Sequence, residues 1–124
     1  MGWRGRRFAD RIRRMSGPHG QDPMVRWLAV PLPVMVDPGA VVVLPRRLLR
    51  ANEIALGVSA GALDLQLGED WIPATLYRWV RVRYGFWLGE VEIPYSSHNG
   101  RLRVPLRQWV RQEAVTLPPG VNDN

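Results

Sequence analysis

Apolar and polar residues alternate along the second half of the chain, in three stretches separated by turn signals. An alternation with a period of two is typical of a β-strand that buries one face. The three stretches are WIPATLYRWVRV (71–82), FWLGEVEIPY (86–95) and RLRVPLRQWV (101–110). The chain turns at Arg83-Tyr84-Gly85 and again at SSHNG, whose Asn99-Gly100 pair is a strong hairpin signal. The pattern therefore predicts three consecutive antiparallel strands.

The first half of the chain predicts shorter elements. VRWLAVPLPVMV (25–36) is typical of an extended segment at a sheet edge, because Pro31 and Pro33 cannot donate ladder hydrogen bonds. We also predict a short buried strand at AVVVLP (40–45), a helix at RRLLRANEIAL (46–56) that ends at Gly57, and a strand at ALDLQL (62–67). The expected fold is mainly β, with α+β as the alternative. It is a small, strongly bent antiparallel sheet or an SH3-like barrel, with one basic N-terminal helix and one short helix in the body.

The alternation also assigns the residues of the three strands to two faces. The predicted core face is almost wholly apolar and is interrupted by Arg78; it takes Ile72, Ala74, Leu76, Val80, Val82, Trp87, Val91, Ile93, Tyr95, Leu102, Val104, Leu106 and Val110. On the opposite face aromatic and arginine side chains alternate; it takes Trp71, Tyr77, Trp79, Arg81, Arg83, Phe86, Leu88, Glu90, Glu92, Arg101, Arg103, Arg107 and Trp109. Single-stranded nucleic-acid binders use such faces, because rings stack on bases while guanidinium groups bind phosphates. The alternative is that the first 70 residues cover part of this face, which would make its aromatic residues core.

Charge is segregated along the chain, which carries seventeen basic residues, all of them Arg, and a net charge of +6. Residues 1–15 have a net charge of +5, and their arginines are Arg4, Arg6, Arg7, Arg11, Arg13 and Arg14. Residues 71–111 again have a net charge of +5, whereas the segment between these two blocks is slightly acidic. Two basic blocks indicate an anionic partner better than the same charge spread evenly. The stretch WRGRRFADRIRRM (3–15) predicts a short basic helix, followed by a linker.

The length predicts a single domain with two flanking segments. We place the basic helix and linker at residues 1–23, one β-rich domain at 24–117 and a C-terminal tail at 118–124. The longest apolar run, WLAVPLPVMV (27–36), is too short and too rich in proline to span a bilayer, and it does not fit a signal peptide. The absence of Cys excludes disulfides and thiol nucleophiles. We expect a cytoplasmic protein.

Motifs for catalysis are weak. His19 lies in the linker and His98 lies in the SSHNG turn, where no carboxylate is placed by sequence to orient it. The sequence carries no phosphate loop, dinucleotide fingerprint or metal cluster, so we expect no enzyme activity, cofactor or metal. EIALGVS (53–59) resembles the turn of helix-turn-helix proteins, which implies a recognition helix after it. The following AGALDLQL alternates like a strand instead.

The sequence therefore predicts a non-catalytic binding protein. Its first expected partner is nucleic acid, single-stranded or structured, bound by the N-terminal arginines and by the sheet face. The sheet residues predicted to bind are Tyr77, Trp79, Arg81, Arg83, Arg101 and Arg103. The alternative is a structural or adaptor protein of a larger assembly, which would use the same surfaces for contacts with an acidic protein. DNA, RNA and the oligomeric state are left open.

Overall fold

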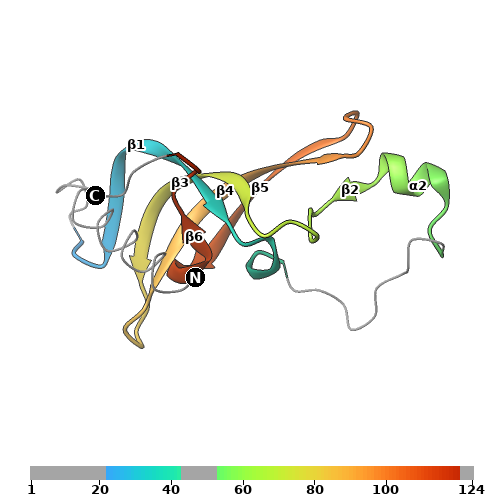
Figure 1. Ribbon diagram of the computed structural model, residues 1–124. Helices are drawn as coiled ribbons and strands as arrows, with labels where there is room; N and C mark the ends of the chain where they lie inside the picture. The colour runs from blue at the N-terminus through green and yellow to red at the C-terminus, as the bar shows by residue number, and fades with distance from the viewer. Residues whose placement is uncertain (1–21, 43–52, 121–124) are drawn as a thin grey trace.

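The computed structural model describes residues 22–42 and 53–120 (Figure 1). Three long strands follow one another in the second half of the chain: β3 (Ile72–Arg81), β4 (Trp87–Ser97) and β5 (Arg103–Arg111). β3 pairs antiparallel with β4, and β4 with β5, so the three strands form the meander that the alternating pattern predicts. The turns contain Gly85 at φ 97° and Gly100 at φ 74°, conformations that favour glycine.

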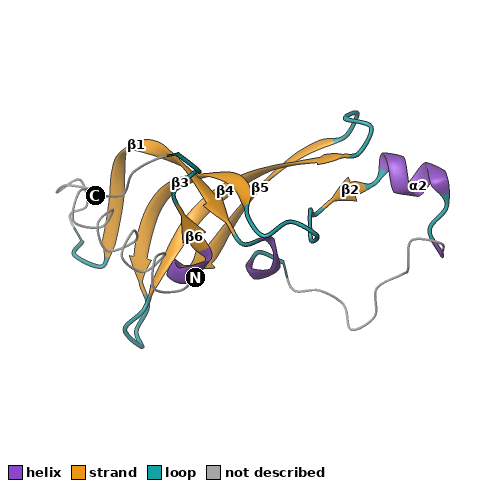
Figure 2. Ribbon diagram, in the orientation of Figure 1, coloured by secondary structure: helices purple, strands orange, loops and turns teal. Residues whose placement is uncertain are grey.

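The sheet continues through β1 (Val25–Val36), which pairs with β3, and β6 (Val115–Thr116), which pairs with β1. A 3-10 turn, η4 (Gln112–Ala114), leads from β5 at one side of the sheet to β6 at the other. The sheet curls, so that β6 and η4 lie beneath its inner side (Figure 2). The predicted fold class, a small, strongly bent antiparallel sheet, is confirmed.

The core lies on the inner side of the curled sheet, where apolar side chains of β1, β3, β4 and β6 meet. Its largest fully buried side chain is Trp79, which is 0% exposed. Trp79 lies opposite Gly89 on β4, and a Cβ at Gly89 would stand 3.0 Å from Cζ3 of the indole. Gly89 therefore provides the space that the Trp79 ring occupies.

A β-bulge on β3 explains why Trp79 is core although the sequence places it on the opposite face. The pairing of β3 with β4 shifts between Leu76 and Arg78, which leaves Tyr77 as an extra residue. Before the bulge, Ile72, Ala74 and Leu76 are buried, and beyond it the buried residue is Trp79. The predicted alternation of β3 is therefore wrong from Arg78 onward, because one inserted residue exchanges the two faces.

The far halves of β4 and β5 project beyond the core and carry β2 (Leu63–Asp64) and α2 (Leu56–Gly61) beside them (Figure 1). β2 pairs with the end of β4, and the Asn99 amide donates to the Ala60 carbonyl at 2.9 Å. α2 buries none of its residues. The short helix is thus attached to the tip of the hairpin through its backbone and does not contribute to the core.

Several predicted elements of the first half differ in the structure. β1 has the predicted bounds but is no edge strand over its whole length, since β3 and β6 flank its end at Met35 and Val36. Only residues 63–64 of the predicted strand 62–67 pair, because the chain turns at Gln66, whose φ is 56°. Residues 46–52 of the predicted helix 46–56 lie outside the described residues, residues 53–55 are not α-helical, and α2 begins at Leu56, where the predicted helix ends. In the predicted strand 40–45, Ala40 belongs to the 3-10 turn η2 (Pro38–Ala40), residues 41–42 follow it as a turn, and residues 43–45 lie outside the described residues.

Candidate functional site

Four strands contribute one residue each to a row across the outer side of the sheet, the side opposite the core. In the strand register, Trp27 of β1 lies opposite Arg78 of β3, and Arg78 lies opposite Glu90 of β4. Glu90 in turn lies opposite Trp109 of β5. The β-bulge brings Tyr77 to the same side as Arg78. We call the surface formed by Trp27, Tyr77, Arg78, Glu90, Arg107 and Trp109 the aromatic–arginine face.

The Arg78 guanidinium is the centre of this face. Its Cζ lies 4.6 Å from the centroid of the Trp27 ring and 5.0 Å from that of Trp109. Both distances are within cation–π range, and the two indoles reach Arg78 from strands on either side of β3. The guanidinium also donates from Nε to Glu90 Oε1 at 2.8 Å. Arg78 therefore has its position fixed by three groups and in turn holds two tryptophans on the surface.

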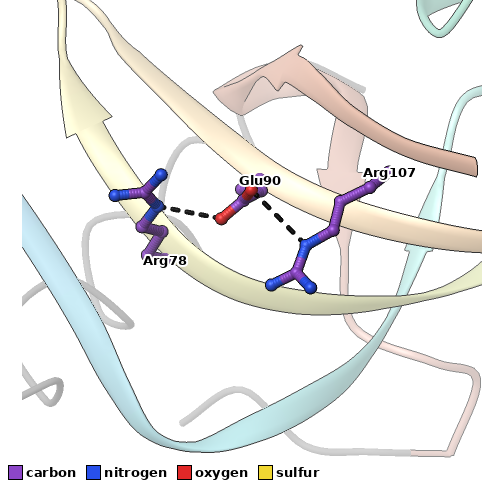
Figure 3. A network of polar contacts seen from close by, with 3 residues as sticks. All are labelled: Arg78, Glu90 and Arg107. Atoms are coloured by element: carbon purple, nitrogen blue, oxygen red, sulfur yellow. Dashed lines mark hydrogen bonds and ion pairs between the residues drawn. The ribbon is translucent and has the colours of Figure 1, made fainter.

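Glu90 links the two arginines of the face, as Figure 3 shows. Its Oε2 lies 3.4 Å from Nε of Arg107, while Oε1 accepts from Arg78. The carboxylate is largely covered, with 15% of its side chain exposed, whereas the Arg107 side chain is 46% exposed. Two guanidinium groups share one carboxylate, so this central cluster retains a net positive charge.

Arg107 also covers Tyr77, with its Cζ 3.7 Å from the centroid of the phenol ring. The face thus presents planar groups at three places: Trp27, which is 40% exposed, Trp109, which is 37% exposed, and the guanidinium of Arg107. Exposed planes around a positive centre can stack on flat ligands and attract anions. Packing against Arg78 accounts for part of the role of Trp27 and Trp109, but it leaves large parts of both indoles exposed to water.

The structure separates the residues that the sequence grouped into one site. Tyr77 lies on the aromatic–arginine face, whereas Trp79 is buried and cannot contact a partner. Arg81 and Arg83 lie at the β3–β4 hairpin end, where Arg81 stacks on Trp87 at 5.4 Å. Arg101 and Arg103 lie exposed at the opposite end, beside the β4–β5 turn. The predicted arm residues Arg4, Arg6, Arg7, Arg11, Arg13 and Arg14 lie outside the described residues.

Of the six residues of the face, Tyr77 alone is among the sheet residues predicted to bind. Glu90, Arg107 and Trp109 belong to the predicted outer face but not to the predicted binding residues, whereas Trp27 and Arg78 belong to neither set. Trp27 belongs to β1, and no pattern in the sequence tells which residue of β3 lies opposite it. Arg78 was assigned to the core face, where it was the only charged residue among thirteen apolar ones. That exception was the available signal, because a charged residue in an apolar series indicates a shift of phase at that point.

An open hollow of about 490 Å³ lies between the Asp64–Glu69 turn and the end of β4. Asp64, Glu69 and His98 all line it, so the histidine and two carboxylates share one surface region. Ser97, also in the lining, is engaged within its own turn: its hydroxyl donates to Asn99 and accepts from the Leu102 amide. The described contacts include no hydrogen bond or ion pair between His98 and either carboxylate. The hollow therefore has polar walls without an assembled acid–base pair.

Within residues 22–42 and 53–120, no three His, Asp or Glu side chains are grouped so that they could hold a metal ion. In the same part of the chain, no helix has the length and apolar character needed to cross a membrane. Comparison of the chain with protein-family models, with curated proteins and with solved structures found no match in any of the three.

Proposed function

We propose that the protein binds single-stranded nucleic acid on the aromatic–arginine face. The observation that carries this proposal is the Trp27–Arg78–Trp109 stack, in which a partly buried ion pair between Arg78 and Glu90 holds two half-exposed indoles on the outer side of a curled sheet. An indole held in this way is available for stacking without a loss of side-chain entropy on binding.

The chemistry of the face matches a single strand better than a duplex. Unpaired bases expose their ring faces, which stack on aromatic side chains with about 1–3 kcal/mol per base, whereas the faces of paired bases are covered. Arg107 is placed beside the indoles to bind phosphate, because half of its side chain is in water and Glu90 is shared with Arg78. Stacking supports binding with little sequence preference, for DNA as well as RNA.

The test is a fluorescence-anisotropy titration of labelled single-stranded DNA and RNA against wild type and Trp109→Ala. We expect about a 5- to 150-fold loss of affinity, which corresponds to one lost stacking contact of about 1–3 kcal/mol. Trp109 is exposed enough for the substitution to leave the fold intact, which a melting curve checks. A duplex of the same sequence should bind more weakly than the single strand.

The matched control is Tyr84→Ala, which removes an aromatic ring that is 83% exposed at the β3–β4 turn, away from the face. This variant should bind as wild type does. Equal losses of affinity in both variants would show that the indoles of the aromatic–arginine face have no special role in binding. If neither oligonucleotide binds at low salt, the proposal fails, and the adaptor alternative becomes the better account of the same surface.

A further inference from the structure

The outer edge of β5 has backbone N–H and C=O groups that no other described strand pairs with. Among the described residues, β5 pairs with β4 alone. Pro94 lies opposite Pro105, and the Ser97 amide donates to the Leu102 carbonyl, so the even-numbered residues of this segment face β4. The odd-numbered residues, Arg103, Arg107 and Trp109 among them, direct their N–H and C=O groups away from β4. Pro105 has the same orientation and lacks an N–H.

The side chains of these same residues give the edge a single sign of charge. Arg103, Arg107 and Arg111 occur at every fourth position of β5, and all three share the outer side of the sheet with Trp109. Glu113 lies 3.2 Å from Arg111, and Glu90 is shared between Arg107 and Arg78. No ion pair of Arg103 occurs among the described contacts. A strand added to this edge would therefore meet an excess of positive charge.

The positive charge of this edge determines which kind of strand can pair with it favourably. A second copy of β5 would bring three more arginines to the same ladder, and like charges opposite each other destabilise a strand pair. A strand with Glu or Asp at alternate positions would instead pair each carboxylate with an arginine. The arginines thus oppose self-association and favour an acidic partner at the same edge.

We propose that β5 accepts an extended acidic peptide, which adds as a further strand along residues 105–111. The amides of Arg107 and Trp109 donate to the peptide, and the carbonyls of Pro105 and Arg107 accept from it, as in other cases of strand addition. Acidic side chains of the peptide lie between Arg107 and Arg111. This site goes beyond nucleic-acid binding, since it uses the backbone of one edge strand.

The first experiment uses wild-type protein and a labelled synthetic peptide in which Glu alternates with Val. The matched control is the same peptide with alternate backbone nitrogens methylated, which keeps the charges and removes the donors of one edge. Methylation of the peptide nitrogens that face β5 should weaken binding about tenfold, because the peptide then loses the free energy of one or two backbone hydrogen bonds. Equal binding of both peptides would mean charge attraction only and would overturn the proposal, as would no binding at low salt.

Amide hydrogen exchange gives a second readout that needs no variant. The amides of Arg107 and Trp109 should exchange fast in the free protein, because both point away from β4 and pair with no other described strand, and slowly once the peptide is bound. The amides of Leu106 and Gln108, which face β4, should be protected in both states. Protection that spreads evenly over β5, or that requires a dimer detected by sedimentation, would contradict the proposed pairing.

Arg107→Pro and Arg107→Ala separate this site from the nucleic-acid site. Both variants lose the guanidinium, and only the proline variant also loses the outward N–H, at a position equivalent to Pro105 in the ladder. Peptide affinity should fall further in Arg107→Pro, whereas oligonucleotide affinity should fall equally in the two. An equal fall for the peptide in two variants that both melt as folded proteins would contradict the proposal.

Discussion

The close contact between Trp79 and Gly89 decides which face of β3 is core. A Cβ at residue 89 would stand 3.0 Å from Cζ3 of Trp79 and 3.1 Å from Cδ1 of Leu76, closer than such atoms normally pack. Both neighbours are fully buried, so neither ring nor methyl group can move into solvent. The pair therefore makes Gly89 a position where the absence of a side chain is required for packing.

We predict that Gly89→Ala lowers the free energy of unfolding by about 1–3 kcal/mol, the usual cost of adding a methyl group to a filled core. Chemical denaturation followed by Trp fluorescence measures this loss. The control is Gly68→Ala, which adds the same methyl group where no other atom lies within 4 Å. A loss at residue 68 as large as that at residue 89 would show that the contact with Trp79 is not the cause.

The hydroxyl of Tyr95 is a second feature of the core with a measurable consequence. The side chain is 1% exposed, and its hydroxyl has no hydrogen-bond partner among residues 22–42 and 53–120. Burial raises the pKa of this phenol above its ordinary value of 10.0, because the charged form loses its hydration. The hydroxyl therefore opposes folding as an unpaired polar group at neutral pH, and at alkaline pH burial also disfavours its ionised form.

We predict that Tyr95→Phe raises the free energy of unfolding by about 1 kcal/mol at neutral pH, because it removes the unpaired hydroxyl. Above pH 10 the unfolded chain releases the Tyr95 proton while the folded chain retains it, so wild-type stability should fall with increasing pH. The fall should be less steep in Tyr95→Phe. Denaturation across the alkaline range measures both effects, with Tyr84→Phe, at an exposed tyrosine, as the control.

At the scale of the elements, alternation was sufficient to predict β3, β4 and β5 and the turns between them, because each strand buries one face. The charged Arg78 in the apolar series is the one sign of a shift near Tyr77, and alternation does not show that the shift is a bulge, because a bulge arises from the pairing with β4 and from the fit between Trp79 and Gly89. In the candidate site too, alternation places the residues of a regular strand correctly and misplaces those beyond the bulge. Arg107 and Trp109 belong to an unbroken strand and were placed on the correct face, whereas Arg78 and Trp79 exchanged places.

The short elements were harder to predict because the sheet pairing determines their length. The alternating stretch 62–67 forms only two residues of strand, paired with Ser96 and Ser97, because the chain turns at Gln66. Gly57 was interpreted as the end of a helix and instead lies in the first turn of α2, where backbone amides lack helical partners in any case. The local sequence signals marked a strand near residue 63 and a helix boundary near Gly57, but they gave neither the length of the strand nor whether the helix begins or ends at Gly57.

At the scale of the whole molecule, we expect the two basic blocks of the chain to affect the salt dependence of oligonucleotide affinity differently. Residues 1–15 contain six arginines and one aspartate, and the second block contributes the arginines of the sheet. Phosphate contacts release counterions, so each one adds about 0.7 to the slope of log affinity against log salt for a single strand. Stacking on indoles contributes affinity that is almost independent of salt.

We therefore predict that deletion of residues 1–15 makes the salt dependence of oligonucleotide binding shallower, by a slope of up to about 4 if all six arginines contact phosphates. Trp109→Ala should instead lower affinity by a similar factor at every salt concentration. Anisotropy titrations at several ionic strengths separate the two effects, and a melting curve confirms that the shortened chain is folded. An unchanged slope after the deletion would exclude the N-terminal arginines from phosphate binding and leave the aromatic–arginine face as the whole of the interface.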